Sequence, residues 1–135
     1  MIQMQTGEIY YAEKGLPMLI RITENGIDIT ENGIDVVGWV VYEKYTMQGM
    51  SLSEEWISPM TSLISRPSFS GNECRLLSES KQMGKWPIGA LISHRGEAYE
   101  VLGYFRRFIA VKVLGTDRLG IIRRYHPTNH RYIML

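Results

Sequence analysis

The segment from Pro87 to Leu135 is the most strongly patterned part of the chain, because short apolar runs alternate there with turn residues. Each run is six or seven residues long, which is the length of a strand and too short for an independent helix. Five runs follow one another: Ile88–Ser93, Ala98–Tyr104, Phe108–Leu114, Leu119–Tyr125 and His130–Leu135. This spacing predicts five short strands that form a small SH3-like or OB-like barrel.

The composition of the whole chain also favours strands. Ile, Val, Thr and the aromatic residues together number 43 of 135, whereas Ala occurs four times. Branched and aromatic side chains pack well on a pleated surface, and the thirteen glycines supply frequent turns. Three further strands are predicted near the N-terminus, where they would form a sheet or a second small barrel: Gly7–Glu13, Met18–Thr23 and Val36–Tyr45.

A perfect tandem repeat lies between the second and third of these strands. The heptad ITENGID occupies Ile22–Asp28 and again Ile29–Asp35. Asn25-Gly26 and Asn32-Gly33 both predict two-residue hairpin turns, so the repeat is either a short three-stranded meander or one hairpin lengthened by duplication. Its acidic residues lack the spacing of an EF-hand loop, so we do not expect a calcium site.

The middle of the chain has a different character. Ser51 to Glu54 matches a capping box, which predicts a short helix over Leu52–Ile57. Residues 66–85 are rich in Ser, Gly, Pro and charge without periodicity, which is typical of a long loop. Trp56 and Trp86 lie in this part of the chain, where an indole either pins a loop or anchors a partner, whereas Trp39 lies in an apolar run and is predicted in the core.

The fold class expected is therefore mainly β, with one or two small SH3-like or OB-like barrels and a loop-rich, partly helical middle. We predict three segments: residues 1–45 as an acidic sheet or small barrel, residues 46–86 as a connector with a short helix, and residues 87–135 as a basic five-stranded barrel.

The net charge of +1 hides a strong asymmetry along the chain. Residues 1–80 hold five basic and eleven acidic side chains, whereas residues 81–135 hold ten basic and three acidic ones. Such a split either neutralises itself within the fold or indicates a charged partner such as nucleic acid.

The basic segment also interleaves cations with aromatic rings, most densely in VLGYFRRFIAVKVL at Val101–Leu114. Proteins that bind single-stranded nucleic acid use this combination, because bases stack on aromatic rings while Arg and Lys neutralise phosphates. The alternative is that the rings form the core and the arginines a solvated rim. The nucleic-acid hypothesis assigns binding to Arg95, Tyr104, Arg106, Arg107, Phe108, Lys112, Arg123, Arg124, Tyr125 and Arg131.

Catalytic and metal-binding patterns are weak. His126 and His130 are four residues apart and His94 could complete a metal site, but Pro127 favours a turn there, so no metal is predicted. Cys74 lies between charges without the glycine-flanked elbow of a nucleophile. With no nucleotide-binding fingerprint either, we expect a protein that is not an enzyme and has no cofactor.

The function predicted from the sequence is a non-enzymatic binding protein whose basic barrel binds DNA or RNA. The alternative is a protein–protein adaptor or inhibitor, of the kind found as accessory proteins of phages and mobile elements, whose acidic N-terminal part docks on a basic partner such as a nucleic-acid-processing enzyme. A single cysteine, no visible secretory signal and a longest apolar stretch of about seven residues predict a cytoplasmic protein without membrane contact.

Overall fold

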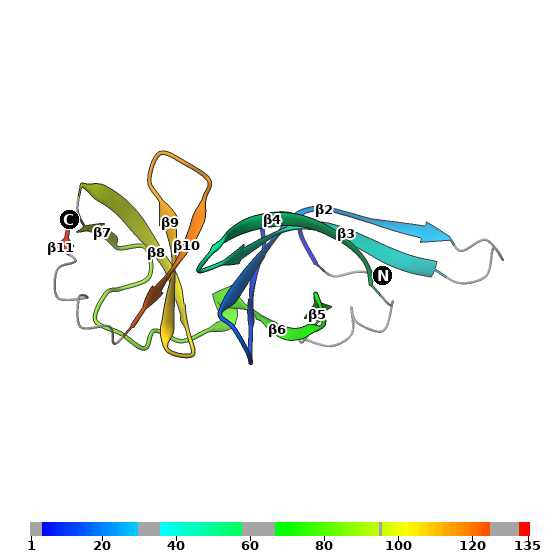
Figure 1. Cartoon of the computed structure of the whole chain (residues 1–135), viewed down its shortest axis with the longest axis horizontal. Helices are drawn as coiled ribbons and strands as arrows, with labels where there is room; N and C mark the ends of the chain where they lie inside the picture. Colours follow the sequence, from blue (N-terminus) through cyan, green and yellow to red (C-terminus); the bar gives the residue numbers. More distant parts are fainter. Residues whose placement is uncertain (1–3, 30–35, 58–66, 95, 125–132) are drawn as a thin grey trace. The chain divides into compact units, whose positions relative to one another are not determined.

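The computed structural model is nearly all β, as predicted, and forms two compact units, Met1–Leu76 and Leu77–Leu135 (Figure 1). We call them unit 1 and unit 2 and describe each by itself. The boundary therefore falls within the segment expected to be a connector, and much of that segment belongs to the sheet of unit 1. The residues that the structure describes are 4–29, 36–57, 67–94, 96–124 and 133–135.

Unit 1 is a six-stranded antiparallel sheet that curls into a nearly closed barrel. The strand order is β4-β3-β2-β1-β6-β5, so consecutive strands of the first four are neighbours. The bounds are β1 (Ile9–Ala12), β2 (Met18–Ile29), β3 (Val36–Thr46), β4 (Gly49–Ile57), β5 (Ser68–Phe69) and β6 (Asn72–Leu76).

The first copy of the tandem repeat lies inside β2, and Asn25-Gly26 is not the predicted turn. The two residues pair with Val40 and Trp39 of β3, and β2 and β3 form a long ribbon (Figure 1). A Cβ atom at position 26 would overlap the indole of Trp39, so a cross-strand ring covers the glycine. The Asn25 side chain donates to the Met4 carbonyl. Residues 30–35, with Asn32-Gly33, lie outside the described residues.

A strand, not the predicted helix, forms over Leu52–Ile57. The segment belongs to β4, which pairs with β3 from Gly38↔Ile57 to Thr46↔Gly49. Because a two-residue turn at Met47 and Gln48 brings the segment directly beside β3, its backbone groups are satisfied by the ladder. Sheet pairing thus outweighs the local preference of the capping box.

The interior of unit 1 is built from alternate residues of its strands. Phe69 is fully buried between two tyrosines, with ring centroids 5.4 Å from Tyr10 and 5.2 Å from Tyr42. Further buried members of the same cluster are Met4, Ala12, Met18, Ile20, Ile22, Val40 and Cys74.

A side-chain network joins the two edges of this sheet. Glu55 of β4 accepts hydrogen bonds from the Tyr42 hydroxyl (2.8 Å) and from the backbone N–H of Ser70 (2.6 Å), between β5 and β6. The Tyr42 and Ser70 hydroxyl oxygens are 2.7 Å apart. Burial raises the pKa of Tyr42, so the phenol stays protonated and able to donate. Glu55 therefore closes the gap that the backbone ladder leaves between β4 and β5.

Unit 2 contains all five strands predicted for the basic segment. Its antiparallel sheet has the order β10-β9-β8-β7-β11. One face carries a core of Trp86, Ile92, Val101, Tyr104, Ile109 and Val111. The bounds are β7 (Leu91–His94), β8 (Glu97–Phe105), β9 (Phe108–Val113), β10 (Leu119–Arg123) and β11 (Ile133–Met134), and a 3-10 turn, η2 (Leu77–Glu79), precedes them.

We predict that Glu55→Ala lowers the free energy of unfolding by about 1–3 kcal/mol, because the Ser70 N–H and the Tyr42 hydroxyl both lose their acceptor. Urea-induced unfolding of the full chain measures the change. Glu54→Ala is the matched control, since this exposed neighbour points to the opposite face of β4. Equal losses in the two variants would contradict a closing role for Glu55.

Candidate functional site

The turn between β8 and β9 presents two adjacent arginines. Phe105 pairs with Phe108, so Arg106 and Arg107 are the two central residues of the hairpin. Arg106 has a φ of 54°, which lies in the left-handed region that favours glycine. The strain of holding another residue type there costs on the order of 1–3 kcal/mol of folding free energy. Its guanidinium lies 5.6 Å from the centroid of Phe108, whose ring lies 5.5 Å from that of Phe105.

Two more arginines reach the same end of the sheet from β10. Arg123 pairs directly with Phe108, and the backbone N–H of Arg124 donates to the Arg107 carbonyl at 2.7 Å. Arg107 and Arg123 are exposed, whereas Arg124 is half-buried. Antiparallel pairing thus gathers four arginines from two separate sequence segments. We call the end of unit 2 formed by Arg106, Arg107, Arg123 and Arg124 the basic end.

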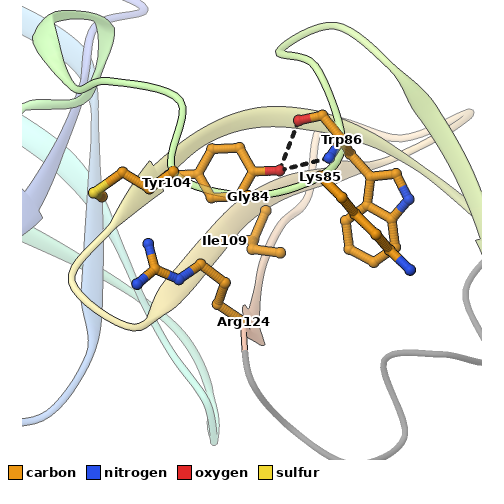
Figure 2. A pocket seen from close by; sticks show the side chains of 7 residues that line it. Gly84, Lys85, Trp86, Tyr104, Ile109 and Arg124 are labelled. Carbon is orange, nitrogen blue, oxygen red and sulfur yellow. Dashed lines mark hydrogen bonds between the residues drawn. The ribbon is translucent and has the colours of Figure 1, made fainter.

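A cavity of about 270 Å³ opens beside this basic end, within unit 2 (Figure 2). Aromatic and aliphatic side chains form much of its wall, and Arg124 and Lys85 contribute two cations. The lining residues are Met83, Gly84, Lys85, Trp86, Tyr104, Ile109 and Arg124.

The loop that forms one wall is fixed by Tyr104. Its hydroxyl accepts from the Trp86 N–H (3.1 Å) and donates to the Trp86 carbonyl (2.6 Å), as Figure 2 shows. Burial raises the pKa of Tyr104, so the donating proton is retained. A Cβ atom on Gly84 would overlap the Tyr104 ring, so glycine is needed for the loop to pass this closely. The Lys85 Nζ lies 4.8 Å from the centroid of the Trp86 ring.

The structure brings together five of the residues assigned to binding from the sequence: Arg106, Arg107, Phe108, Arg123 and Arg124. Two others differ from expectation. Tyr104 is fully buried with its hydroxyl bonded to Trp86, so it offers no exposed ring for stacking. It lies on the core face because the strand has a bulge between Val101 and Gly103 and turns at Arg106.

Lys112 is the second residue that differs from expectation. Lys112 pairs with Glu100 and Leu119. It lies four residues along β9 from Phe108, so about 13 Å of strand separates it from the basic end. The assigned residues Arg95, Tyr125 and Arg131 lie outside the described part of the chain.

Sequence reasoning missed the cavity-lining loop at residues 83–86. The available signal is a Trp between a Lys and a Pro in an aperiodic stretch, which indicates either a loop pin or a partner anchor. Trp86 is 5% exposed and packs in the core, which confirms that it pins the loop. Trp39 is only partly buried, over Gly26 rather than in the interior, because it lies on the other face of β3 from Val40.

The cysteine and histidine candidates gain no support. Cys74 is buried in unit 1, and burial raises the pKa of its thiol to about 12, so almost no thiolate nucleophile exists near neutral pH. His126 and His130 lie outside the described residues. Within the described ranges, no group of three or more His, Cys, Asp or Glu side chains is arranged to hold a metal ion.

Comparisons of the chain with protein-family models, with curated proteins and with solved structures found no match. Among the helices of the described segments, none is both long and apolar enough to cross a membrane.

The pKa of Cys74 predicts a specific loss of stability in alkali. The thiol titrates at about 12 in the folded protein against a reference value of 9.0, so the unfolded chain loses this proton first as the pH rises. Stability from this group is complete below pH 9 and decreases up to pH 12, by about 2 kcal/mol at pH 10.5.

Urea unfolding of the wild type and of Cys74→Ala at pH 8 and pH 10.5 measures this effect. We expect the wild type to lose about 2 kcal/mol more than the variant between the two pH values, because alanine has no proton to lose. Identical pH dependence in the two proteins would show that the thiol does not titrate differently on folding.

Proposed function

We propose that unit 2 binds nucleic acid through its basic end. The observation that carries the proposal is the convergence of Arg106, Arg107, Arg123 and Arg124 on one end of the sheet. Four arginines at one end of a sheet raise the local positive potential, and such a potential attracts anions. Phosphate groups spaced along a nucleic-acid backbone supply several anions in succession.

The net charge of unit 2 also supports the proposal that it binds nucleic acid. Residues 77–135 hold ten basic and four acidic side chains, a formal net charge of +6, whereas residues 1–76 hold five and ten, a net charge of −5. A unit with this excess attracts polyanions at distances beyond direct contact, and phosphate neutralisation supplies most of the non-specific affinity of nucleic-acid-binding proteins.

The basic end also holds side chains with planar groups. The guanidinium of Arg106 lies near the ring of half-buried Phe108, which in turn lies beside Phe105. Arginine planes and aromatic rings are both surfaces on which bases stack, so this group supports contact with a base as well as with phosphate.

A second candidate function, a protein–protein adaptor, is favoured by a different observation on unit 1. Leu52 and Trp56 of β4 are 68% and 67% exposed, and acidic Glu54 lies between them on the same face. Exposed apolar residues beside a carboxylate suit a basic protein partner. Capture of a protein that resists nuclease treatment and is lost in Trp56→Ser would favour the adaptor.

We predict that binding to a short single-stranded DNA weakens with salt along a log–log line, because phosphate contact releases counterions. Arg107→Ala and Arg123→Ala should each reduce the slope by about one, since each removes one cation from the basic end. Fluorescence anisotropy across a range of chloride concentrations measures the slope.

Arg118→Ala is the matched control, because this exposed arginine lies in the turn at the opposite end of β9. It should leave the slope almost unchanged. If binding is absent even at low salt, or if Arg118→Ala has the same effect as the other two variants, the basic end is not the binding surface.

A further inference from the structure

We infer that the cavity beside the basic end takes one unpaired nucleobase of a single-stranded nucleic acid. This inference rests on the proposed function and adds the class of ligand: a strand with free bases rather than a duplex. It depends on the size of the cavity, on the chemistry of its wall, and on how the wall is held.

The volume fits a ring-sized ligand. Pockets for drug-sized molecules begin at about 300 Å³, and this cavity of about 270 Å³ lies just below that range. It is therefore suited to one flat heterocycle and not to a stack of paired bases. A base within a duplex is stacked and paired, so it reaches a pocket of this kind only after it leaves the helix.

The wall matches the chemistry of a nucleotide. The apolar residues Met83, Trp86 and Ile109 line the cavity, with Met83 the most exposed of the three, while Lys85 and Arg124 supply a cation each. Figure 2 shows Arg124 and Lys85 on different sides of the space next to Ile109. A base bound there would have its two flanking phosphates near these cations, and none of the seven lining residues is acidic.

The cavity is held open before any ligand arrives. Both hydrogen bonds of the Tyr104 hydroxyl go to the backbone of Trp86, so the loop cannot collapse onto the sheet without breaking them. Gly84 packs directly on the Tyr104 ring, which fixes the loop at a second point. A preformed site avoids the entropic cost of ordering a loop when the ligand binds.

The cavity is also connected to the proposed phosphate-binding surface. Arg124 lines the cavity, and its backbone N–H is bonded to the carbonyl of exposed Arg107 in the turn between β8 and β9. A strand that follows the arginines of the basic end would thus bring its next base to the cavity mouth.

The test compares two probes of equal charge: an oligothymidylate of about 12 nucleotides and an abasic chain of the same length. We expect the oligothymidylate to bind about tenfold more tightly, because one base gains apolar contact in the cavity, with the same salt slope for both probes. If neither probe binds, the proposed function fails. If both bind equally, phosphate binding stands and the base pocket is overturned.

Two tryptophan variants then locate the effect. Met83→Trp fills the cavity from its rim, where Met83 is 44% exposed, and should bring the affinity for oligothymidylate down to that for the abasic chain. Ile88→Trp is the matched control, since Ile88 is 49% exposed in the same unit and does not line the cavity. It should keep the tenfold difference. A difference that survives in Met83→Trp would place the base elsewhere and overturn the inference.

Discussion

Antiparallel pairing in a fixed register is the constraint on which both the core and the candidate site of unit 2 depend. In β9, alternate residues face opposite sides of the sheet, so Ile109 and Val111 enter the core while Phe108 stays on the other face, beside Arg123. A slip of one residue would exchange these roles and bury a guanidinium. The same register that buries the apolar residues therefore brings the arginines together.

Much of this arrangement could be predicted from the sequence. The strand positions could be predicted because apolar runs of strand length end at turn residues. All five runs after Pro87 contain a strand in the structure. The pairing of Phe105 with Phe108 follows from a two-residue turn at Arg106-Arg107, which makes β8 and β9 neighbours. Clustering of Arg106 and Arg107 with Arg123 and Arg124 then requires only that consecutive strands lie side by side.

What could not be predicted depends on contacts between residues distant in sequence. Asn25-Gly26 is a strong turn signal, yet it lies in a strand because Trp39 covers the glycine and Met4 accepts from the asparagine. The cavity is equally non-local, since the hydroxyl of Tyr104 fixes a loop eighteen residues before it in the chain. Neither contact produces a periodic pattern in the sequence, because each joins a single residue to one backbone group or ring that is distant in the chain.

Arg106 shows how local strain and charge are balanced in this fold. A glycine at position 106 would relieve the strain of a positive φ. A turn with one arginine in place of two would have no repulsion between positions 106 and 107. The hairpin tolerates both costs because the Phe105–Phe108 pair and the Arg124–Arg107 hydrogen bond hold the flanking strands on either side of the turn. Neither Arg106 nor Arg107 belongs to the buried core cluster of unit 2. An arginine kept in this strained turn fits the proposed contact with nucleic acid.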